Sequence, residues 1–276
     1  MSTVSKFRTQ SLRHWSNPQH DTFSQVDFTT SFVAPPRLPV GIRKLDISNK
    51  ANIRAKATIE NITKSSAIYH FTSWADTINY SGVCISLNLA PANLEFLTGE
   101  HMRNLISDPK SPASRRIYFE RPFVTPPKVV VFLNYIDLDK SRNWRLKTTA
   151  TDIDIHGFNL NIETWDDTIL YAAQAGWIAY PEDKPHIFST SVNTCEVRAW
   201  YKPQLEQSKS ISFGDVEFWK VPNVFMALNS FDIDCRANFR LNMYTDNVTQ
   251  QGLTWHIFTW ADSILYSAGA TIIAVN

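Results

Sequence analysis

The stretch Asn143–Tyr171 reads NWRLKTTATDIDIHGFNLNIETWDDTILY, and its frame occurs three times in the chain. Asn-x-Arg recurs as NIR and NFR, and the end of the stretch recurs as WADTINY from Trp74 and WADSILY from Trp260. In every copy the Arg precedes the Trp by twenty positions, and a Tyr follows the Trp by six. A period of roughly ninety residues is typical of whole small domains rather than solenoid repeats. We therefore predict three tandem domains, at residues 1–91, 92–183 and 184–276.

The composition bounds the class of protein. The 276 residues are 43% hydrophobic, which is enough for packed cores, and 13% are aromatic, which suits sheet packing or stacking on a ligand. The net charge is +1 and no block of like charges occurs, so the basic footprint of a nucleic-acid-binding protein is missing. Cys84, Cys195 and Cys235 are too scattered for a disulfide framework or a zinc site, and we expect free thiols.

The N-terminal residues contain no apolar segment of the kind that a signal peptide needs. No run of apolar residues approaches the length of a membrane span, so membrane insertion is not expected. These features favour a soluble protein that is either cytoplasmic or exported by a non-classical route.

The strand that carries the Arg alternates between apolar and polar residues. Ile53, Ala55 and Ala57 fall on one face, and Arg54 falls on the other with polar neighbours. Applied to the strand that ends in the Trp, the same parity puts the Trp on the polar face. Short strands separated by Asn, Asp, Ser and Pro predict an all-β fold of antiparallel β-sandwiches.

Two other strands, at residues 129–133 and 224–228, are apolar at nearly every position. A strand covered on one side would alternate, so both faces must be covered. We expect one face to pack in the repeat's own core and the other against a neighbouring repeat. Three such strands around one axis would form a pseudo-threefold trimer within a single chain. The matching segment LPVGIRKL, from Leu38, fits less well.

An outward Trp beside an outward Arg, with a Tyr nearby, can bind a sugar. The indole offers a flat apolar face to the C–H side of a pyranose, and the guanidinium offers a fork of donors to hydroxyls. A second interpretation stays open, in which the three Trp are buried where repeats meet. Each Arg would then pair with the Asp eight positions before it, namely Asp46, Asp137 or Asp232.

The segments IDLDKSRNWR and TWDDTILY resemble the H-type lectin family, and the similarity covers all three repeats. This resemblance implies a six-stranded antiparallel β-sandwich in each repeat, trimeric assembly, and binding of N-acetylgalactosamine or galactose in clefts between protomers, without cofactor or catalysis. The sugar-contacting positions carried over are Arg54, Trp74 and Tyr80, then Arg145, Trp165 and Tyr171, then Arg240, Trp260 and Tyr266.

This sequence departs from the family at two places. The family's snail agglutinin has a His directly after the Trp, where this chain has Ala75, Asp166 and Ala261. The family's acidic contact is matched best by Asp108 in the middle repeat, more weakly by Asp21 in the first, and in the third only Glu206 is available. The resemblance therefore implies that the middle repeat, with Asp166 and Asp108 among its contacts, carries the best-supported site.

Other chemistry is less well supported. DLDKSRN and DIDCRAN start like a calcium loop but lack its Gly and closing Glu. Asp166 and Asp167 are adjacent on an extended chain, so they face opposite ways and do not form a glycosidase pair. We predict a non-catalytic lectin for glycans with terminal N-acetylgalactosamine or galactose, a monomeric pseudo-trimer that could associate further. The alternative is a structural or adhesion module with partly decayed sugar sites.

Overall fold

A computed structural model describes residues 2–276, and this part of the chain forms eighteen strands and two short 3-10 helices, Thr9–Ser11 and Thr194–Glu196. Repeat 1 contains β1 (Thr3–Arg8), β2 (Asp21–Asp27), β3 (Val40–Ile47), β4 (Ile53–Glu60), β5 (Ser66–Thr72) and β6 (Asn79–Asn88). Repeat 2 contains β7 (Leu97–Asn104), β8 (Ser114–Tyr118), β9 (Lys128–Leu138), β10 (Trp144–Thr151), β11 (Gly157–Glu163) and β12 (Leu170–Tyr180).

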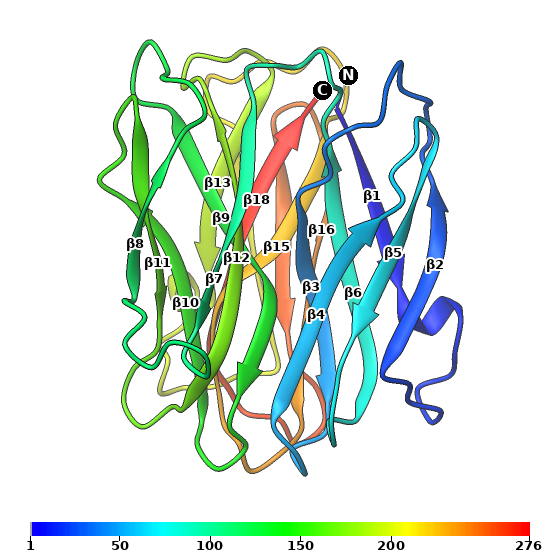
Figure 1. Cartoon of the computed structure of the whole chain (residues 1–276), viewed down its shortest axis with the longest axis vertical. Coiled ribbons are helices and arrows are strands. Elements are labelled where there is room, and N and C mark those ends of the chain that lie inside the picture. The colour runs from blue at the N-terminus through cyan, green and yellow to red at the C-terminus, as the bar shows by residue number, and fades with distance from the viewer. Residues whose placement is uncertain (1) are drawn as a thin grey trace.

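Repeat 3 contains β13 (Ile187–Asn193), β14 (Glu206–Ser212), β15 (Asn223–Ile233), β16 (Phe239–Asp246), β17 (Gly252–Phe258) and β18 (Leu265–Val275). The strands run roughly along the long axis of the molecule, and the two ends of the chain lie close together (Figure 1). Among the described residues, no helix has the length and apolar character that crossing a membrane requires. The predicted all-β class is confirmed.

The six-stranded sheets are shared between repeats. Each repeat supplies two three-stranded halves, for example β1-β6-β3 and β2-β5-β4 in repeat 1, and each half continues into a half of a neighbour. The joining antiparallel pairs are β4 with β9, β10 with β15, and β16 with β3. Repeat 1 thus joins repeat 2, repeat 2 joins repeat 3, and repeat 3 joins repeat 1. The resemblance implied six strands in each repeat, but did not indicate that each of the three antiparallel sheets would span two repeats.

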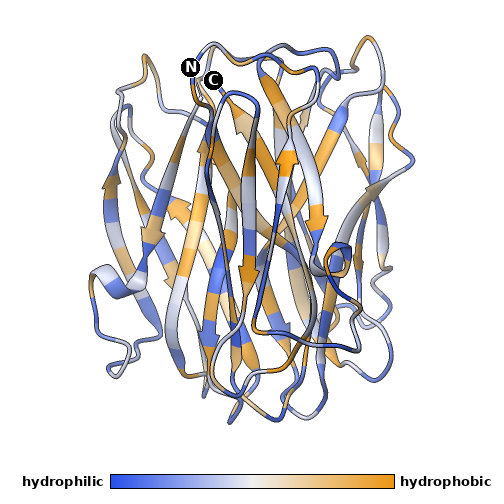
Figure 2. Ribbon diagram, turned by 180° about the vertical axis from the view of Figure 1, so that it is seen from behind, coloured by the Kyte–Doolittle hydropathy of each residue, from blue (hydrophilic) through white to orange (hydrophobic). Residues whose placement is uncertain are grey.

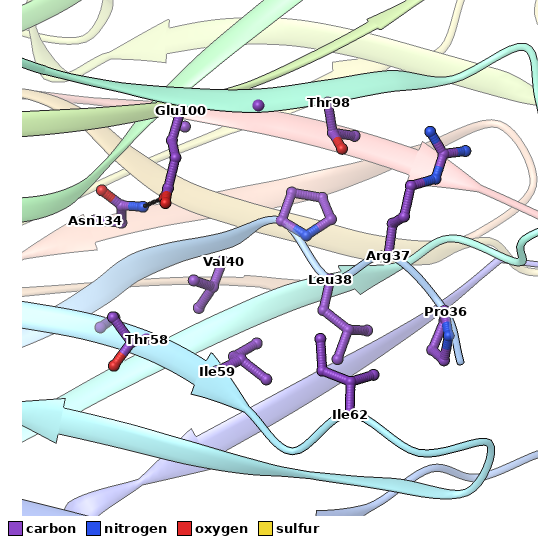
Figure 3. A pocket seen from close by; sticks show the side chains of 14 residues that line it. Pro36, Arg37, Leu38, Val40, Thr58, Ile59, Ile62, Thr98, Glu100 and Asn134 are labelled. Carbon is purple, nitrogen blue, oxygen red and sulfur yellow. Dashed lines mark hydrogen bonds between the residues drawn. The ribbon is translucent and has the colours of Figure 1, made fainter.

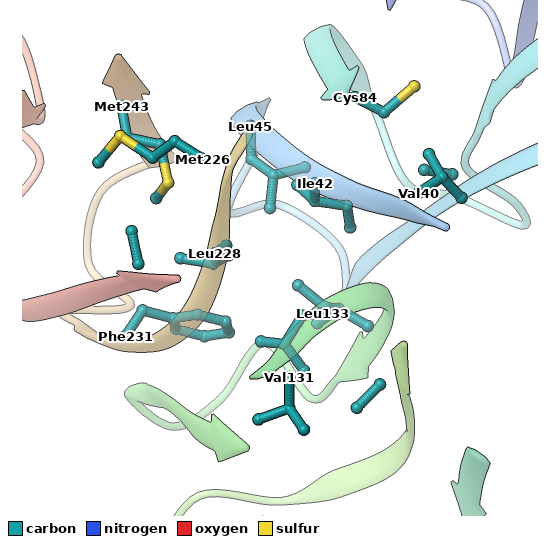
Figure 4. Close-up of a cluster of buried hydrophobic side chains, with 14 of the residues drawn as sticks. Val40, Ile42, Leu45, Cys84, Val131, Leu133, Met226, Leu228, Phe231 and Met243 are labelled. Atoms are coloured by element: carbon teal, nitrogen blue, oxygen red, sulfur yellow. The ribbon is translucent and has the colours of Figure 1, made fainter. Parts of the chain in front are cut away.

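The strands with two apolar faces are buried on both sides, as predicted. One face of β9 and β15 enters a core to which all three repeats contribute, with Val131 and Leu133 lying near Leu228 (Figure 4). The other face forms a second buried cluster, in which the rings of Phe132 and Phe225 lie 5.0 Å apart. Apolar residues accordingly concentrate on the strands, while the connecting loops are more hydrophilic (Figure 2).

Gly41 explains why the first repeat's strand fits the apolar pattern less well. It stands five residues before Asp46, as Phe132 and Ala227 stand before Asp137 and Asp232. A Cβ atom at Gly41 would lie 2.5 Å from the Cβ of Ala227 and 3.0 Å from the Phe132 ring. One large side chain and two small ones therefore fill a single layer between the repeats, as close packing requires.

The alternation of the Arg-bearing strand is confirmed on its inner face. Ile53, Ala55 and Ala57 on β4 are buried, as are the inward residues of β10 and β16. The outer face differs from the expectation, because the neighbouring repeat covers it. Only 15% of the Arg54 side chain and 11% of the Arg145 side chain are exposed. The three cysteines are free thiols.

Candidate functional site

The Asn of each Asn-x-Arg motif binds the following repeat. Its side-chain oxygen accepts a backbone N–H from the loop after the neighbour's central strand. The pairs are Asn52 with Lys140 at 3.1 Å, Asn143 with Cys235 at 3.1 Å, and Asn238 with Asn49 at 3.2 Å. The same contact in all three copies means that this Asn serves assembly.

The Arg of the motif also reaches across to the following repeat. Its Nε lies beside an Asp carboxylate that faces it in strand register. The pairs are Arg54 with Asp137 at 3.5 Å, Arg145 with Asp232 at 3.4 Å, and Arg240 with Asp46 at 3.7 Å. The interpretation that pairs each Arg with the Asp eight positions before it is therefore wrong about the repeat, because every partner belongs to the next one.

A second set of contacts, with residues of the same repeat, holds the guanidinium in place. In each copy Nη1 donates to the Asp and the hydroxyl that follow the Trp. The partners are Asp76 and Thr77 for Arg54 at 2.6 and 3.2 Å, Asp167 and Thr168 for Arg145 at 2.8 and 3.3 Å, and Asp262 and Ser263 for Arg240 at 2.5 and 3.0 Å. These hydrogen bonds from Arg lower the pKa of the three carboxyl groups. The Arg is thus held rigidly before any ligand arrives.

The turn after the Trp has an unusual backbone in every copy. The residue next to the Trp takes a left-handed conformation, with φ of 54° at Ala75, 54° at Asp166 and 56° at Ala261. A side chain disfavours this conformation, which costs roughly 1–2 kcal/mol for Ala. The turn places the Trp just beyond the strand rather than within it, next to the joint between repeats.

The three Trp are accessible to different degrees. Trp165 is 39% exposed, while Trp74 and Trp260 are partly buried. The ring of Tyr135 lies 5.0 Å from that of Trp74, and the Lys44 ammonium lies 5.3 Å from the Trp260 ring. None of the three indoles is enclosed in the interior, so the interpretation that buries them does not hold.

The Tyr of each set comes from the following repeat. Tyr80 lines one cleft together with Arg240 and Trp260, not with Arg54 and Trp74. We name this region the 3–1 cleft. By analogy, we name the corresponding residues at the other two joints the 1–2 and 2–3 clefts. The 1–2 cleft consists of Arg54, Trp74, Asp137 and Tyr171, whose side chain contacts Asn52. The 2–3 cleft combines Arg145, Trp165 and Asp232 with Tyr266, which lies on the strand paired with β15.

The Tyr hydroxyl is occupied in two clefts. Tyr171 donates to Asp139 at 2.8 Å, and Tyr266 donates to Asp234 at 2.9 Å. Ser48 stands at the matching place of repeat 1, two residues after Asp46. Within residues 2–276 the Tyr80 hydroxyl has no hydrogen-bond partner, so it is available in the 3–1 cleft.

The clefts also differ in whether Nη2 of the Arg is free. Asp166 lies 3.2 Å from Nη2 of Arg145, so every nitrogen of that guanidinium faces a carboxylate. For Arg54 and Arg240, Nη2 has no partner among the described residues. The residue after the Trp causes this difference, because Ala75 and Ala261 have no group to offer.

The Asp that faces each Arg is largely buried. In Asp46, Asp137 and Asp232 the atom Oδ1 is shielded from solvent and is the oxygen that faces the Arg Nε, at 3.7, 3.5 and 3.4 Å. Burial raises the pKa of all three carboxyl groups, and the facing Arg opposes that rise. The side chains of Asp46 and Asp232 are still 17% and 16% exposed, so their carboxylates can accept a hydrogen bond from a ligand.

The 3–1 cleft is an open cavity of about 460 Å³. Its walls come from two repeats and consist of Gln10, Trp15, Lys44, Asp46, Tyr80, Asn238, Arg240, Trp260 and Ala261. The set combines an indole face, two cations, a carboxylate and a free phenol. That combination can hold a small polar molecule with one apolar face.

The acidic residues predicted from the sequence lie between the first two strands of their repeats or at the start of the second. Asp108 is exposed in the loop between β7 and β8 and accepts the backbone N–H of Lys110 at 3.2 Å. Asp21 pairs with His70 at 3.0 Å, and Glu206 is exposed at the start of β14. None of these three residues lines the 3–1 cleft.

Trp15 is a second aromatic residue of the 3–1 cleft, and it was not predicted from the sequence. Its ring lies 6.3 Å from that of Tyr80, and Trp200 lies 6.5 Å from Tyr266 in the same way. Arg13 fixes the segment before Trp15, donating to the carbonyls of Asn79 and Tyr80 at 2.8 and 3.0 Å. The signal was present as RHW and RAW, which repeat 2 lacks.

A groove lies along each joint between repeats, and the groove at the 3–1 joint adjoins the 3–1 cleft. The 1–2 groove has a volume of about 410 Å³ and includes Glu100, which accepts a hydrogen bond from Asn134 at 2.8 Å (Figure 3). The 2–3 groove, of about 280 Å³, includes Lys147 and Asn229. The 3–1 groove, of about 200 Å³, shares Gln10 and Lys44 with the 3–1 cleft.

Comparison with known proteins agrees with the three repeats in the chain. The family model described as H-type lectin domain matches residues 24–84, 114–180 and 208–275, which together make up more than half of the chain. A protein of Fuscovulum blasticum, described as ATP synthase subunits region ORF 7, is 35% identical over 63 residues, or 23% of this chain. The chain spans about half the length of that relative, 55%.

Proposed function

The chain belongs to the H-type lectin family, whose domains bind carbohydrate without catalysis, and on that premise we propose that its three inter-repeat clefts bind terminal N-acetylgalactosamine or galactose. The cyclic pairing of repeats supports a pseudo-threefold arrangement within the single chain. The partners would be glycans or glycoconjugates with such a terminal sugar.

The observation that carries this proposal is the set of free groups around Trp260. Nη2 of Arg240 and the hydroxyl of Tyr80 are unengaged donors, and the Asp46 carboxylate, whose side chain is 17% exposed, supplies an acceptor. The indole supplies a flat apolar wall between them. A galactose ring with its C–H face on the indole would exchange bound water for these partners, so its desolvated hydroxyls would be satisfied.

The three clefts are not expected to bind equally. We infer that the 3–1 cleft is the strongest site. In the 2–3 cleft, Nη2 of Arg145 pairs with Asp166 and the hydroxyl of Tyr266 donates to Asp234, so neither donor is free for a sugar. The 1–2 cleft is intermediate, with Nη2 of Arg54 free but the hydroxyl of Tyr171 engaged. The middle repeat, preferred from the sequence, therefore supplies Arg and Trp to the weakest cleft.

Several sites on one rigid body raise avidity on a glycan-covered surface when their spacing matches the sugars. Cross-linking of glycan-bearing surfaces, and so adhesion or agglutination, would follow. The engaged groups of the 2–3 cleft favour a second candidate function for that cleft alone, a purely structural joint whose sugar site has decayed.

Titration calorimetry tests the proposal. N-acetylgalactosamine and galactose should bind, with glucose much weaker, and Trp260→Ala and Arg240→Ala should each weaken the strongest site at least about tenfold. Trp219→Ala is the matched control, because Trp219 is 68% exposed and outside the clefts. Absence of heat with any galactoside at millimolar concentration would contradict the proposal.

A further inference from the structure

The 3–1 groove differs from its two counterparts in charge. Four cationic side chains line it, from β1 and from β3: Lys6, Arg8, Arg43 and Lys44. No acidic residue is part of its lining. The remaining walls are neutral and include Asn242 and Tyr244 of repeat 3. The whole chain carries a net charge of only +1, so this is a local concentration of positive charge.

The fold does not require these cations. The matching positions in the other repeats are identified by strand register and by their spacing in the sequence from Asp46, Asp137 or Asp232. They are Glu100, Met102, Asn134 and Tyr135 in repeat 2, and Ser191, Asn193, Asn229 and Ser230 in repeat 3. The same backbone positions thus carry formal charges of +4, −1 and 0, and the strands form in every case.

The cations are also poorly compensated within the protein. Among residues 2–276, no carboxylate lies within 4.0 Å of Lys6, Arg8 or Arg43. Arg43 donates Nε to the carbonyl of Met243 at 2.7 Å, and Lys44 donates to Gln10 at 3.1 Å. Burial and neighbouring cations lower the pKa of Lys6 to about 8 and that of Arg43 to about 10. Such mutual repulsion disfavours the charged forms until an anion enters.

The 3–1 groove adjoins the 3–1 cleft, because Gln10 and Lys44 line both cavities. We propose that the 3–1 groove is an oxyanion subsite, which receives a sulfate or carboxylate substituent on a glycan whose terminal galactose or N-acetylgalactosamine lies on Trp260. This inference rests on the proposed sugar site and adds the class of glycan. Charge-assisted hydrogen bonds from Lys6 and Arg43 would hold the oxyanion.

A small anionic group fits the groove better than a polyanion. The volume of about 200 Å³ accommodates a sulfate or a carboxylate with its linkage, and the basic residues gather at one joint rather than along a track. A nucleic acid needs a series of phosphate contacts over a surface. The 1–2 groove would disfavour the same group, because Glu100 stands where repeat 1 has Lys6.

Titration calorimetry at low salt with three lactosides, one neutral, one sulfated and one sialylated, tests the subsite. At least one anionic lactoside should bind the wild-type chain about tenfold more tightly than the neutral one. The relative affinities of the two anionic ligands identify which oxyanion fits. The variant Lys6→Ser/Arg43→Asn, which introduces the residues of repeat 3, should lose that preference and bind neutral lactoside unchanged.

Lys147→Asn serves as the matched control, because it removes one positive charge from the 2–3 groove and introduces the residue found at the same place in repeat 3. It should keep the preference for the anionic lactoside. Equal affinity for all three lactosides in the wild type, or a preference that survives Lys6→Ser/Arg43→Asn, would overturn the proposal. Tight binding of heparin that galactose does not compete would also overturn it, in favour of a polyanion surface.

Inorganic sulfate separates this inference from the sugar proposal. At a few millimolar and constant ionic strength, sulfate should raise the melting temperature of the wild type but not that of Lys6→Ser/Arg43→Asn. If this difference appears while no galactoside binds, the sugar proposal fails and the anion site stands. If neutral lactoside binds and sulfate has no selective effect, the sugar site stands and the anion subsite fails.

Discussion

In the 3–1 cleft Arg240 keeps Nη2 unengaged, and in the 2–3 cleft Arg145 gives the same atom to Asp166 at 3.2 Å. The rest of the frame is alike, since each Arg pairs with the buried Asp of the following repeat and with the carboxylate after its Trp. The motif therefore has two roles, which are joining the repeats and presenting groups to a ligand. The contacts that join repeats are the same in both clefts, whereas the groups left free for a ligand differ.

The largest expected effect comes from removing the Phe132 ring, which packs between the repeats. Phe132→Ala should destabilise the fold by about 4 kcal/mol, because Gly41 and Ala227 cannot fill the space between the repeats. Urea denaturation measures the loss, and Phe23→Ala, whose ring is 58% exposed on β2, should change stability by less than about 0.5 kcal/mol. A small effect at Phe132 would mean that the buried cluster around Phe132 and Phe225 does not hold the repeats together.

Asp166→Ala should make the 2–3 cleft more like the 3–1 cleft. Freeing Nη2 of Arg145 restores a donor, and we expect N-acetylgalactosamine to bind that cleft about fivefold more tightly. The titration is done with Trp74→Ala/Trp260→Ala in the background, so that the other two sites are silent. Asp183→Ala, an exposed carboxylate away from the clefts, controls for the change in net charge. Unchanged or weaker binding after Asp166→Ala would show that Arg145 is not the limiting group.

Lowering the pH should weaken sugar binding before it unfolds the chain. Burial raises the pKa of both Asp46 and Asp232 above the ordinary value, although the facing Arg opposes that rise in each case. Sugar affinity that uses these acceptors should therefore fall in a pH range above 3.8, the ordinary Asp value. Calorimetry across that range checks the loss of affinity, and Asp46→Asn should remove the pH dependence of the 3–1 cleft.

Stability should follow a different pH window. A carboxyl group with a raised folded-state pKa binds its proton more readily in the folded chain, so acidification does not cost stability there. The pKa values of Asp76, Asp167 and Asp262 are lowered, so their contribution is present above the unfolded-state value and is lost as the pH falls through the folded-state value. Affinity should thus decline before the fold does. Simultaneous loss of both in thermal melts and titrations would contradict this separation.

The smallest expected effect concerns the turn after the Trp. Ala261→Gly should stabilise the chain by roughly 0.5 kcal/mol, since Gly takes the left-handed conformation without a steric cost. Asp166→Gly should gain less, because Asp tolerates this conformation better than Ala and its ion pair with Arg145 is lost. Urea denaturation of both variants ranks them. The opposite order would mean that the turn is not strained as its φ values indicate.

Strand parity could be predicted from the sequence because it is local. Alternation on β4 placed Ile53 and Ala55 inward, and the continuous apolar run on β9 required a second covering layer. The partner of each Arg could not be predicted, since Asp46, Asp137 and Asp232 have the same spacing from the Arg of their own repeats. Which of them faces a given Arg depends on how repeats pair in space.

The lining of the clefts was harder to predict for the same reason. Tyr80 and Trp15 belong to repeat 1 but face Arg240 and Trp260 of repeat 3. Periodicity within one repeat carries no information about that juxtaposition. The four cations of the 3–1 groove come from β1 and β3, which are separated in sequence and adjoin only through β6. The net charge of +1 for the whole chain gives no indication of this local cluster of cations.

A crystal structure of the chain soaked with N-acetylgalactosamine tests the central claim most directly. We predict a sugar ring stacked on Trp260 in the 3–1 cleft, with hydroxyls bonded to Arg240, Asp46 and Tyr80, and weaker occupancy in the 2–3 cleft. A sugar bound away from all three joints between repeats, or clefts that stay empty at saturating sugar, would contradict the account.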